Sequence, residues 1–212
     1  FRVPFTYMTY CRLSDPVFER GLKDFLAVCN VVKTFRNMRI LQISTRPFEF
    51  WTTMCNEGEL LENFNIQLSP VPMPELTDEI RKAKEEGTEA AEVAQYCRDH
   101  MEICVKDEEL ENVAALKVAM KRLVKKYGCQ AAAIQCWNQL QSEIGIMPCA
   151  ANSLLNEEGI PVVCETDIHG AVTALLVEAA GMGETRSFFA DWTIRHPDVK
   201  NGELLQHCGP WP

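Results

Sequence analysis

The chain has 212 residues, of which 47% are hydrophobic and 24% are charged, and this composition suits one or two globular domains with an ample core. Its formal net charge of −9 argues against a nucleic-acid partner, because phosphate backbones are bound by clustered Lys and Arg. The richest basic cluster, within residues 117–126, ends a helical pattern, where cations complement the helix dipole. We therefore expect no nucleic-acid binding.

The sequence also bears on membranes and on redox compartment. It contains no run of about 18 apolar residues and no secretory signal pattern, so it predicts neither a membrane span nor secretion. None of the ten cysteines forms a C-x-x-C pair, and free cysteines without a secretory signal are typical of the reducing cytoplasm. The chain runs from Phe1 to Trp211-Pro212, and these ends predict a piece of a larger polypeptide.

The first third of the chain alternates helical and strand patterns. A helix starts at residues 14–16, where Pro16 follows a capping residue, and apolar residues at helical spacing continue to about Asn37. The next elements are a buried strand, a helix and a short strand that Pro70 closes, at residues 39–44, 48–61 and 65–68. This strand–helix–strand order predicts a parallel sheet.

The rest of the chain continues the α/β pattern. Residues 77–127 are rich in Glu, Lys and Ala and predict a long helical region with breaks at Gly87-Thr88 and Lys106-Asp107. Short apolar runs predict three further strands, at residues 131–135, 160–164 and 188–190. A helix is predicted at residues 168–180. The predicted fold class is α/β: a Rossmann-like parallel sheet flanked by helices, followed by the start of a second domain.

These patterns also predict how the chain divides into domains. We expect residues 1–13 to be the tail of a missing N-terminal domain and residues 14–187 to form the central α/β domain. We expect residues 188–212 to begin a C-terminal domain. Chemistry is usually placed where a buried strand delivers a polar side chain to its carboxyl end. By that rule, the polar residues that follow short apolar runs on either side of the boundary between residues 187 and 188 are candidates for a functional site.

Glu165 and Asp191 each follow a short apolar run, and His207 lies further along the same stretch. If each acidic residue ends its own strand, the two carboxylates can meet at one edge of the sheet. Two carboxylates and an imidazole would suit Mn²⁺ or a similar divalent metal. The alternative is that Glu165 and Asp191 are ordinary loop residues, and spacing alone leaves both interpretations open.

Other polar and aromatic residues near predicted strand ends are weaker candidates. Trp137 and Asn138 follow the strand at 131–135 and could line a substrate crevice, or form a satisfied capping turn. Trp192 could wall a sugar pocket, but packing as an ordinary aromatic is the favoured interpretation. Asp167 could orient Glu165 or cap the helix at 168–180, and capping is the favoured interpretation.

Three ordered blocks of this sequence, CETDIHGA, FFADWTIRHP and NGELLQHCG, resemble the L-fucose and L-arabinose isomerase superfamily, and its fucose-isomerase-like branch in particular. Weaker likeness extends over residues 40–46 and 131–156. The resemblance implies a Mn²⁺ ion held by Glu165, Asp191 and His207. The usual metal-binding His of the fucose branch lies much further along, beyond the end of this chain, so His207 would substitute for it or the site would be incomplete.

The resemblance implies a sugar aldose–ketose isomerase that acts on a monosaccharide through a metal-bound enediol. Glu165 and Asp191 would then exchange protons with neighbouring substrate carbons as general base and acid. The resemblance also implies a homo-oligomer, a hexamer, with residues 188–212 opening the isomerase domain. Two alternatives remain: a non-catalytic sugar-binding or regulatory relative, and a structural fragment that depends on the missing parts for activity.

Overall fold

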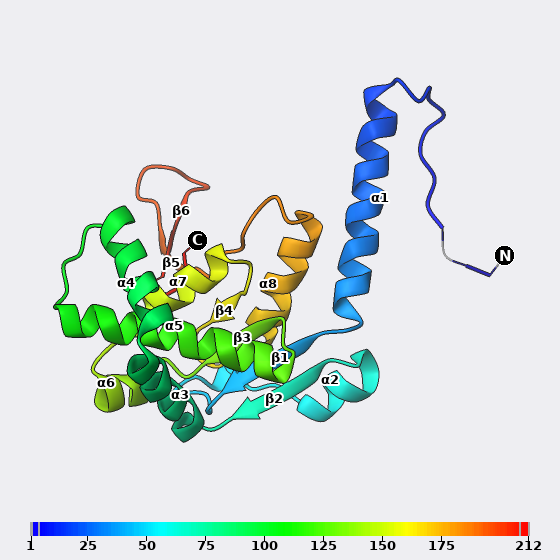
Figure 1. The fold of residues 1–212 in the computed structure, drawn as a ribbon. Helices are drawn as coiled ribbons and strands as arrows, with labels where there is room; N and C mark the ends of the chain where they lie inside the picture. Colours follow the sequence, from blue (N-terminus) through cyan, green and yellow to red (C-terminus); the bar gives the residue numbers. More distant parts are fainter. Residues whose placement is uncertain (1, 4, 208, 212) are drawn as a thin grey trace.

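The computed structural model describes residues 2–3, 5–207 and 209–211. A four-stranded parallel sheet in the order β2-β1-β3-β4 forms its centre, and helices cover both faces of the sheet (Figure 1). The strands are β1 (Arg39–Ile43), β2 (Gln67–Val71), β3 (Ala131–Ile134) and β4 (Val162–Val163). The predicted α/β fold class is confirmed.

Successive side chains of the two central strands enter opposite cores, as the twofold repeat of a strand requires. Ile40 of β1 packs in the core beneath one helical layer, whereas Leu41 and Ile43 pack in the core beneath the other. All four residues of β3 are fully buried, which is the pattern of a strand covered on both sides. Three of these four residues are alanines, so helices can approach β3 closely from both sides.

The helices that share the larger core are α3 (Met73–Glu86), α4 (Thr88–His100), α5 (Asp107–Tyr127), α6 (Gln139–Ile144) and α7 (Cys149–Glu157). The predicted breaks are confirmed, because Gly87 takes a φ of 75° between α3 and α4, and Lys106 caps the start of α5. The helical region begins at Met73 rather than at the predicted Thr77, because a proline is tolerated in the first turn of a helix.

The second face of the sheet is covered by α8 (Ile168–Ala180), which matches the predicted helix. Leu60 of α2 (Glu57–Phe64) joins the same core. The helix α1 (Pro16–Phe35) has no buried residue and extends away from the body of the molecule (Figure 1). It contacts α8, where the Asn30 side-chain amide donates to the Ala179 carbonyl oxygen at 2.8 Å.

Three sequence predictions are corrected by the structure. β2 continues through Pro70 to Val71, because an edge strand has one side without ladder partners and tolerates a proline there. The predicted helix at 48–61 is a short 3₁₀ turn, η1 (Trp51–Thr53), followed by α2. Residues 188–190 are not a strand; the strand begins at Asp191 instead.

A separate two-stranded antiparallel sheet follows, formed by β5 (Asp191–Arg195) and β6 (Glu203–Gln206). All of its residues are exposed, so it packs little against the main sheet. The domain boundary predicted between residues 187 and 188 stays a prediction. Among the described residues, no helix is both long enough and apolar enough to cross a bilayer.

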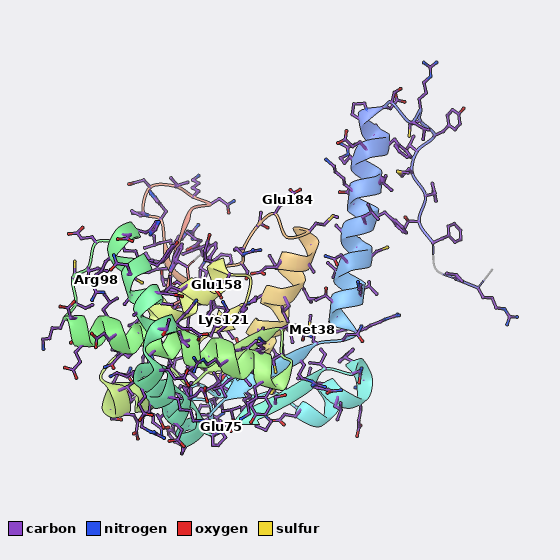
Figure 2. All side chains as sticks on the ribbon, viewed as in Figure 1. Met38, Glu75, Arg98, Lys121, Glu158 and Glu184 are labelled. Carbon is purple, nitrogen blue, oxygen red and sulfur yellow. The ribbon has the colours of Figure 1, made fainter. Side chains whose placement is uncertain are left out.

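Four of the five basic residues of α5 form ion pairs, namely Lys117, Lys121, Arg122 and Lys126. Lys117 is buried and pairs with Glu158, and Lys121 of the same helix reaches Glu158 at 2.7 Å (Figure 2). Burial raises the pKa of Glu158, but the two lysines outweigh this effect and hold its pKa below the ordinary value. Glu158 thereby joins the end of α7 to α5.

We predict that Glu158→Gln lowers the free energy of unfolding, because it leaves the Lys117 ammonium buried without a counter-charge. The expected loss at pH 7 is about 1–2 kcal/mol, modest because Glu158 stays partly exposed to water. Since the folded-state pKa of Glu158 lies below its ordinary value of 4.5, its contribution is complete above pH 4.5 and disappears as pH falls through the folded-state pKa. Urea unfolding should therefore show a difference between wild type and variant that shrinks under acid; a difference independent of pH would contradict the prediction.

Candidate functional site

The loops that follow β1, β3 and β4 meet at the carboxyl edge of the sheet. The Ser44 hydroxyl donates to the Gln135 side-chain oxygen at 2.6 Å, joining the loop after β1 to the loop after β3. The Thr166 hydroxyl donates to the Thr45 carbonyl oxygen at 3.1 Å, and this bond joins the loop after β4 to the loop after β1. β1 and β3 are neighbours at the point where the strand order reverses, which is where ligands bind in open α/β sheets.

Glu165 lies in a sharp turn between β4 and α8. Glu165 and Thr166 take φ angles of 56° and 53°, a left-handed conformation that is uncommon for residues with side chains and a marked outlier for a β-branched threonine. The backbone N–H of Thr166 donates to the Ile134 carbonyl oxygen at 3.1 Å, which helps to hold the turn against β3. Strained backbone of this kind is concentrated at functional sites.

Cys136, in the loop after β3, forms two hydrogen bonds with Glu165. The Cys136 thiol donates to Oε1 of Glu165 at 3.3 Å, and the Glu165 backbone N–H donates to the Cys136 Sγ at 3.4 Å. Cys136 is 1% exposed and Glu165 is 8% exposed, so both bonds lie away from water. Within the described part of the chain, Oε2 of Glu165 has no hydrogen-bond partner, and this leaves it available to a ligand.

Burial raises the pKa of the Glu165 carboxyl above its ordinary value. The Cys136 hydrogen bond and His207 oppose this rise, whereas the charges of Asp191 and Asp167 add to it. Asp191 and His207 therefore lie within electrostatic range of Glu165. Across the described residues, however, the ligand atoms of Glu165, Asp191 and His207 do not all come within 4.8 Å of one another. A metal site formed by these three residues stays a prediction.

His207, just after β6, is oriented by Phe189, which precedes β5. Its Nδ1 lies 2.8 Å from the Phe189 carbonyl oxygen, and since a carbonyl only accepts, Nδ1 carries the proton. In the neutral ring Nε2 then keeps a lone pair, which is how proteins present a histidine to a metal or a proton. The Phe189 ring also packs beside the imidazole, with centroids 5.3 Å apart.

The three candidate substrate-binding residues, Trp137, Asn138 and Trp192, do not all lie on the same element. Trp137 is 42% exposed after β3, and its ring meets Phe50 edge-on at 5.6 Å. Asn138 occupies the first capping position of α6, but its side chain makes no capping hydrogen bond. Trp192 is 77% exposed on β5, so it is not the ordinary packed aromatic of the favoured interpretation. Their role in binding substrate stays a prediction.

Asp167 caps α8, because its Oδ1 accepts from the Gly170 backbone N–H at 3.0 Å, as the favoured interpretation predicted. A largely apolar cavity of about 510 Å³ lies beside this helix start, between α8 and residues 186–189. Glu165, Asp191 and His207 do not line it. We therefore do not assign that cavity to the candidate site.

Sequence reasoning missed the buried partners of Glu165. Cys136 carried no signal beyond its place in an apolar run, and neither did Asn152 of α7. Asn152 is fully buried; its amide nitrogen lies 3.8 Å from the Cys164 Sγ, and its Oδ1 has no hydrogen-bond partner. A buried orphan oxygen is rare in folded proteins and calls for an explanation. The unpaired oxygen becomes evident only when the structure shows α7 packed against β4.

The chain is similar to proteins named sulfoquinovose isomerase. It is 25% identical over 191 residues to the one from Priestia megaterium (strain ATCC 12872 / QMB1551), covering 90% of this chain and 42% of that protein. It is 25% identical over 197 residues to the one from Alkalicoccus urumqiensis (92% and 43%) and 26% identical over 194 residues to the one from Clostridium sp. strain MSTE9 (87% and 41%).

These similarities make the chain a distant relative of sugar isomerases. No family model matches it. The chain spans about two fifths of the length of the curated relatives it matches. The comparisons do not reach the L-fucose and L-arabinose isomerase superfamily, so that more specific resemblance stays a prediction.

We predict that Asn152→Leu leaves the fold unharmed or stabilises it. Leucine has nearly the same shape, and the substitution removes the orphan oxygen while sacrificing only a weak contact to sulfur. The expected change in the free energy of unfolding lies between zero and a gain of about 1 kcal/mol. Urea unfolding measures it, and a loss above about 2 kcal/mol would mean that Asn152 is part of the structural framework.

Proposed function

We propose that this chain is the part of a sugar aldose–ketose isomerase that supplies Glu165, Asp191 and His207 to the active site. The observation that carries the proposal is the burial of Glu165 at the carboxyl edge of the sheet, within electrostatic range of Asp191 and His207. The similarity to proteins named sulfoquinovose isomerase supports the same reaction class. The superfamily resemblance adds the roles of the individual residues.

The donor set matches the metal that the resemblance implies. Two carboxylates and an imidazole with a free Nε2 are ligands for Mn²⁺ and similar divalent ions. Such an ion, when bound, polarises the substrate oxygens and so acidifies the C–H next to the carbonyl. The thiol and carbonyl contacts of Glu165 and His207 would orient these two ligands, as supporting hydrogen bonds do in metal sites.

Glu165 is suited to take a proton from the substrate. Its Oε1 is fixed by the Cys136 thiol, which leaves Oε2 to face the reacting carbon. Burial raises the pKa of Glu165, and a carboxylate with a raised pKa is the stronger base near neutral pH. Asp191, from β5 of the separate two-stranded sheet, would exchange a proton with the neighbouring carbon, so that the aldose becomes the ketose through an enediol. Which of the two acids acts first in each direction is left open.

The proposal extends to the identity of the sugar substrate. The relatives named sulfoquinovose isomerase make sulfoquinovose the first sugar to test, and the superfamily resemblance adds L-fucose and L-arabinose. Trp137, Asn138 and Trp192 are the proposed substrate-binding residues, because each presents a side chain that is not fully packed. Homo-oligomerisation, as a hexamer, is also part of the proposal and rests on the resemblance alone.

We predict that the full-length protein interconverts an aldose and a ketose from this panel, and that Glu165→Gln lowers kcat by about 10²–10⁴-fold, the range for removing a general base. The matched control is Glu143→Gln, an acidic residue exposed on α6. The assay is exchange of substrate hydrogen with solvent, followed by NMR. Equal loss in both variants would contradict the role of Glu165, and sugar binding without any exchange would favour a non-catalytic sugar-binding relative.

We predict that His207→Gln weakens Mn²⁺ binding by the full-length protein about 10–100-fold, because the glutamine lacks the Nε2 lone pair. The control is His100→Gln, which changes an exposed histidine stacked on Tyr96 of α4. Titration of free Mn²⁺ by electron paramagnetic resonance gives both affinities without an activity assay. Unchanged affinity in His207→Gln would remove His207 from the proposed ligand set.

A further inference from the structure

Two cysteine thiols and the Glu165 carboxylate form a buried cluster. The Sγ atoms of Cys136 and Cys164 and a carboxylate oxygen of Glu165 all lie within 4.8 Å of one another. Cys136 and Cys164 are 1% and 2% exposed, and both are free thiols. Cys136 follows β3 and Cys164 follows β4, so the pairing of these two parallel strands brings the sulfur atoms together.

The spacing of the cluster is close to that of a tetrahedral thiolate site. With metal–sulfur bonds of about 2.3 Å and metal–oxygen bonds of about 2.0–2.2 Å, neighbouring ligand atoms lie about 3.4–3.8 Å apart. The Cys136 Sγ and Glu165 Oε1 are already 3.3 Å apart. The remaining pair distances, within 4.8 Å, need only small side-chain rotations to reach the same range.

Asn152 provides an independent indication of a missing ligand. Its amide nitrogen points at the Cys164 Sγ from 3.8 Å, and its Oδ1, fully buried, has no partner. A buried amide oxygen without a hydrogen bond is explained if a cation, or a water bound to one, occupies the space beside it. The orphan oxygen therefore belongs to a side chain that contacts one of the two sulfur atoms.

We propose that Cys136, Cys164 and Glu165 bind a thiophilic divalent cation of the zinc class. Thiolates select zinc-like ions, whereas Mn²⁺ prefers oxygen and imidazole ligands, so this is a different ion from the manganese of the proposed reaction. Both cysteines are free thiols in the structure. Cation binding then releases thiol protons to solvent as the metal–sulfur bonds form.

Glu165 would be shared between the two ions, and this has a functional consequence that rests on the proposed function. A carboxylate coordinated to zinc is a poor base and is drawn away from Asp191 and His207. Occupation of the thiolate site would therefore silence the isomerase. The protein would be active in the zinc-free state, in which the Cys136 thiol only holds Oε1 of Glu165 in place.

The test of binding is titration of the reduced full-length protein with Cd²⁺, a spectroscopic substitute for zinc, followed by cadmium–thiolate charge-transfer absorption. Wild type should bind about one tight equivalent more than Cys136→Ser/Cys164→Ser. The matched control is Cys97→Ser/Cys129→Ser, which removes two cysteines that lie in α4 and at the amino end of β3. A folded Cys136→Ser/Cys164→Ser variant that binds as much Cd²⁺ as the control would overturn the proposal.

A second measurement avoids mutation in case the double variant does not fold. Wild-type protein loaded with one equivalent of zinc should show two sulfur ligands at about 2.3 Å and an oxygen ligand at about 2.0–2.2 Å in X-ray absorption. An oxygen- and nitrogen-only shell would reject the site. If the thiolate signature is present but no sugar is isomerised, the proposed function fails while the cation site stands. If isomerisation is present and zinc does not inhibit it, the shared use of Glu165 is wrong.

Discussion

The burial of β3 on both faces is the constraint on which the candidate site depends. Its three alanines let helices pack closely on both faces, and its backbone pairs with β1 on one edge and with β4 on the other. That pairing sets the register in which Ala132 faces Val162. The register in turn places Cys136, just beyond β3, against Glu165, just beyond β4.

Burying Glu165 is unfavourable, and its surroundings offset only part of the penalty. A carboxylate removed from water requires charge-assisted hydrogen bonds or a counter-charge. Glu165 receives one hydrogen bond from a thiol, which is a weak donor, and a partial benefit from His207, while Asp191 and Asp167 work against it. The two consecutive left-handed residues add backbone strain. Burial, a weak hydrogen-bond donor and backbone strain at Glu165 all lower stability, so a chemical role explains this residue better than a structural one.

Local signals predicted the helices well and the strand pairing poorly. Asp167 and Gly87 act on adjacent backbone, so the start of α8 and the break before α4 could be derived from sequence. The passage of β2 through Pro70 depends on β2 being an edge strand, which is a property of the whole sheet. Asp191 begins a strand instead of following one, and it lies within electrostatic range of Glu165, while its place in a shared site stays a prediction. The Cys136–Glu165 contact joins residues 29 apart, and no local rule reaches that far.

The two metal chemistries proposed for this site compete because a single carboxylate faces two kinds of donor. The Sγ atoms of Cys136 and Cys164 lie within 4.8 Å of a Glu165 carboxylate oxygen, and the proposed ligands Asp191 and His207 lie within electrostatic range of the same carboxyl. Softer ions favour the first set and harder ions the second, so occupancy follows which ion is available rather than affinity alone. The sulfur atoms are fixed by the main sheet, whereas Asp191 and His207 are carried by the exposed β5–β6 segment.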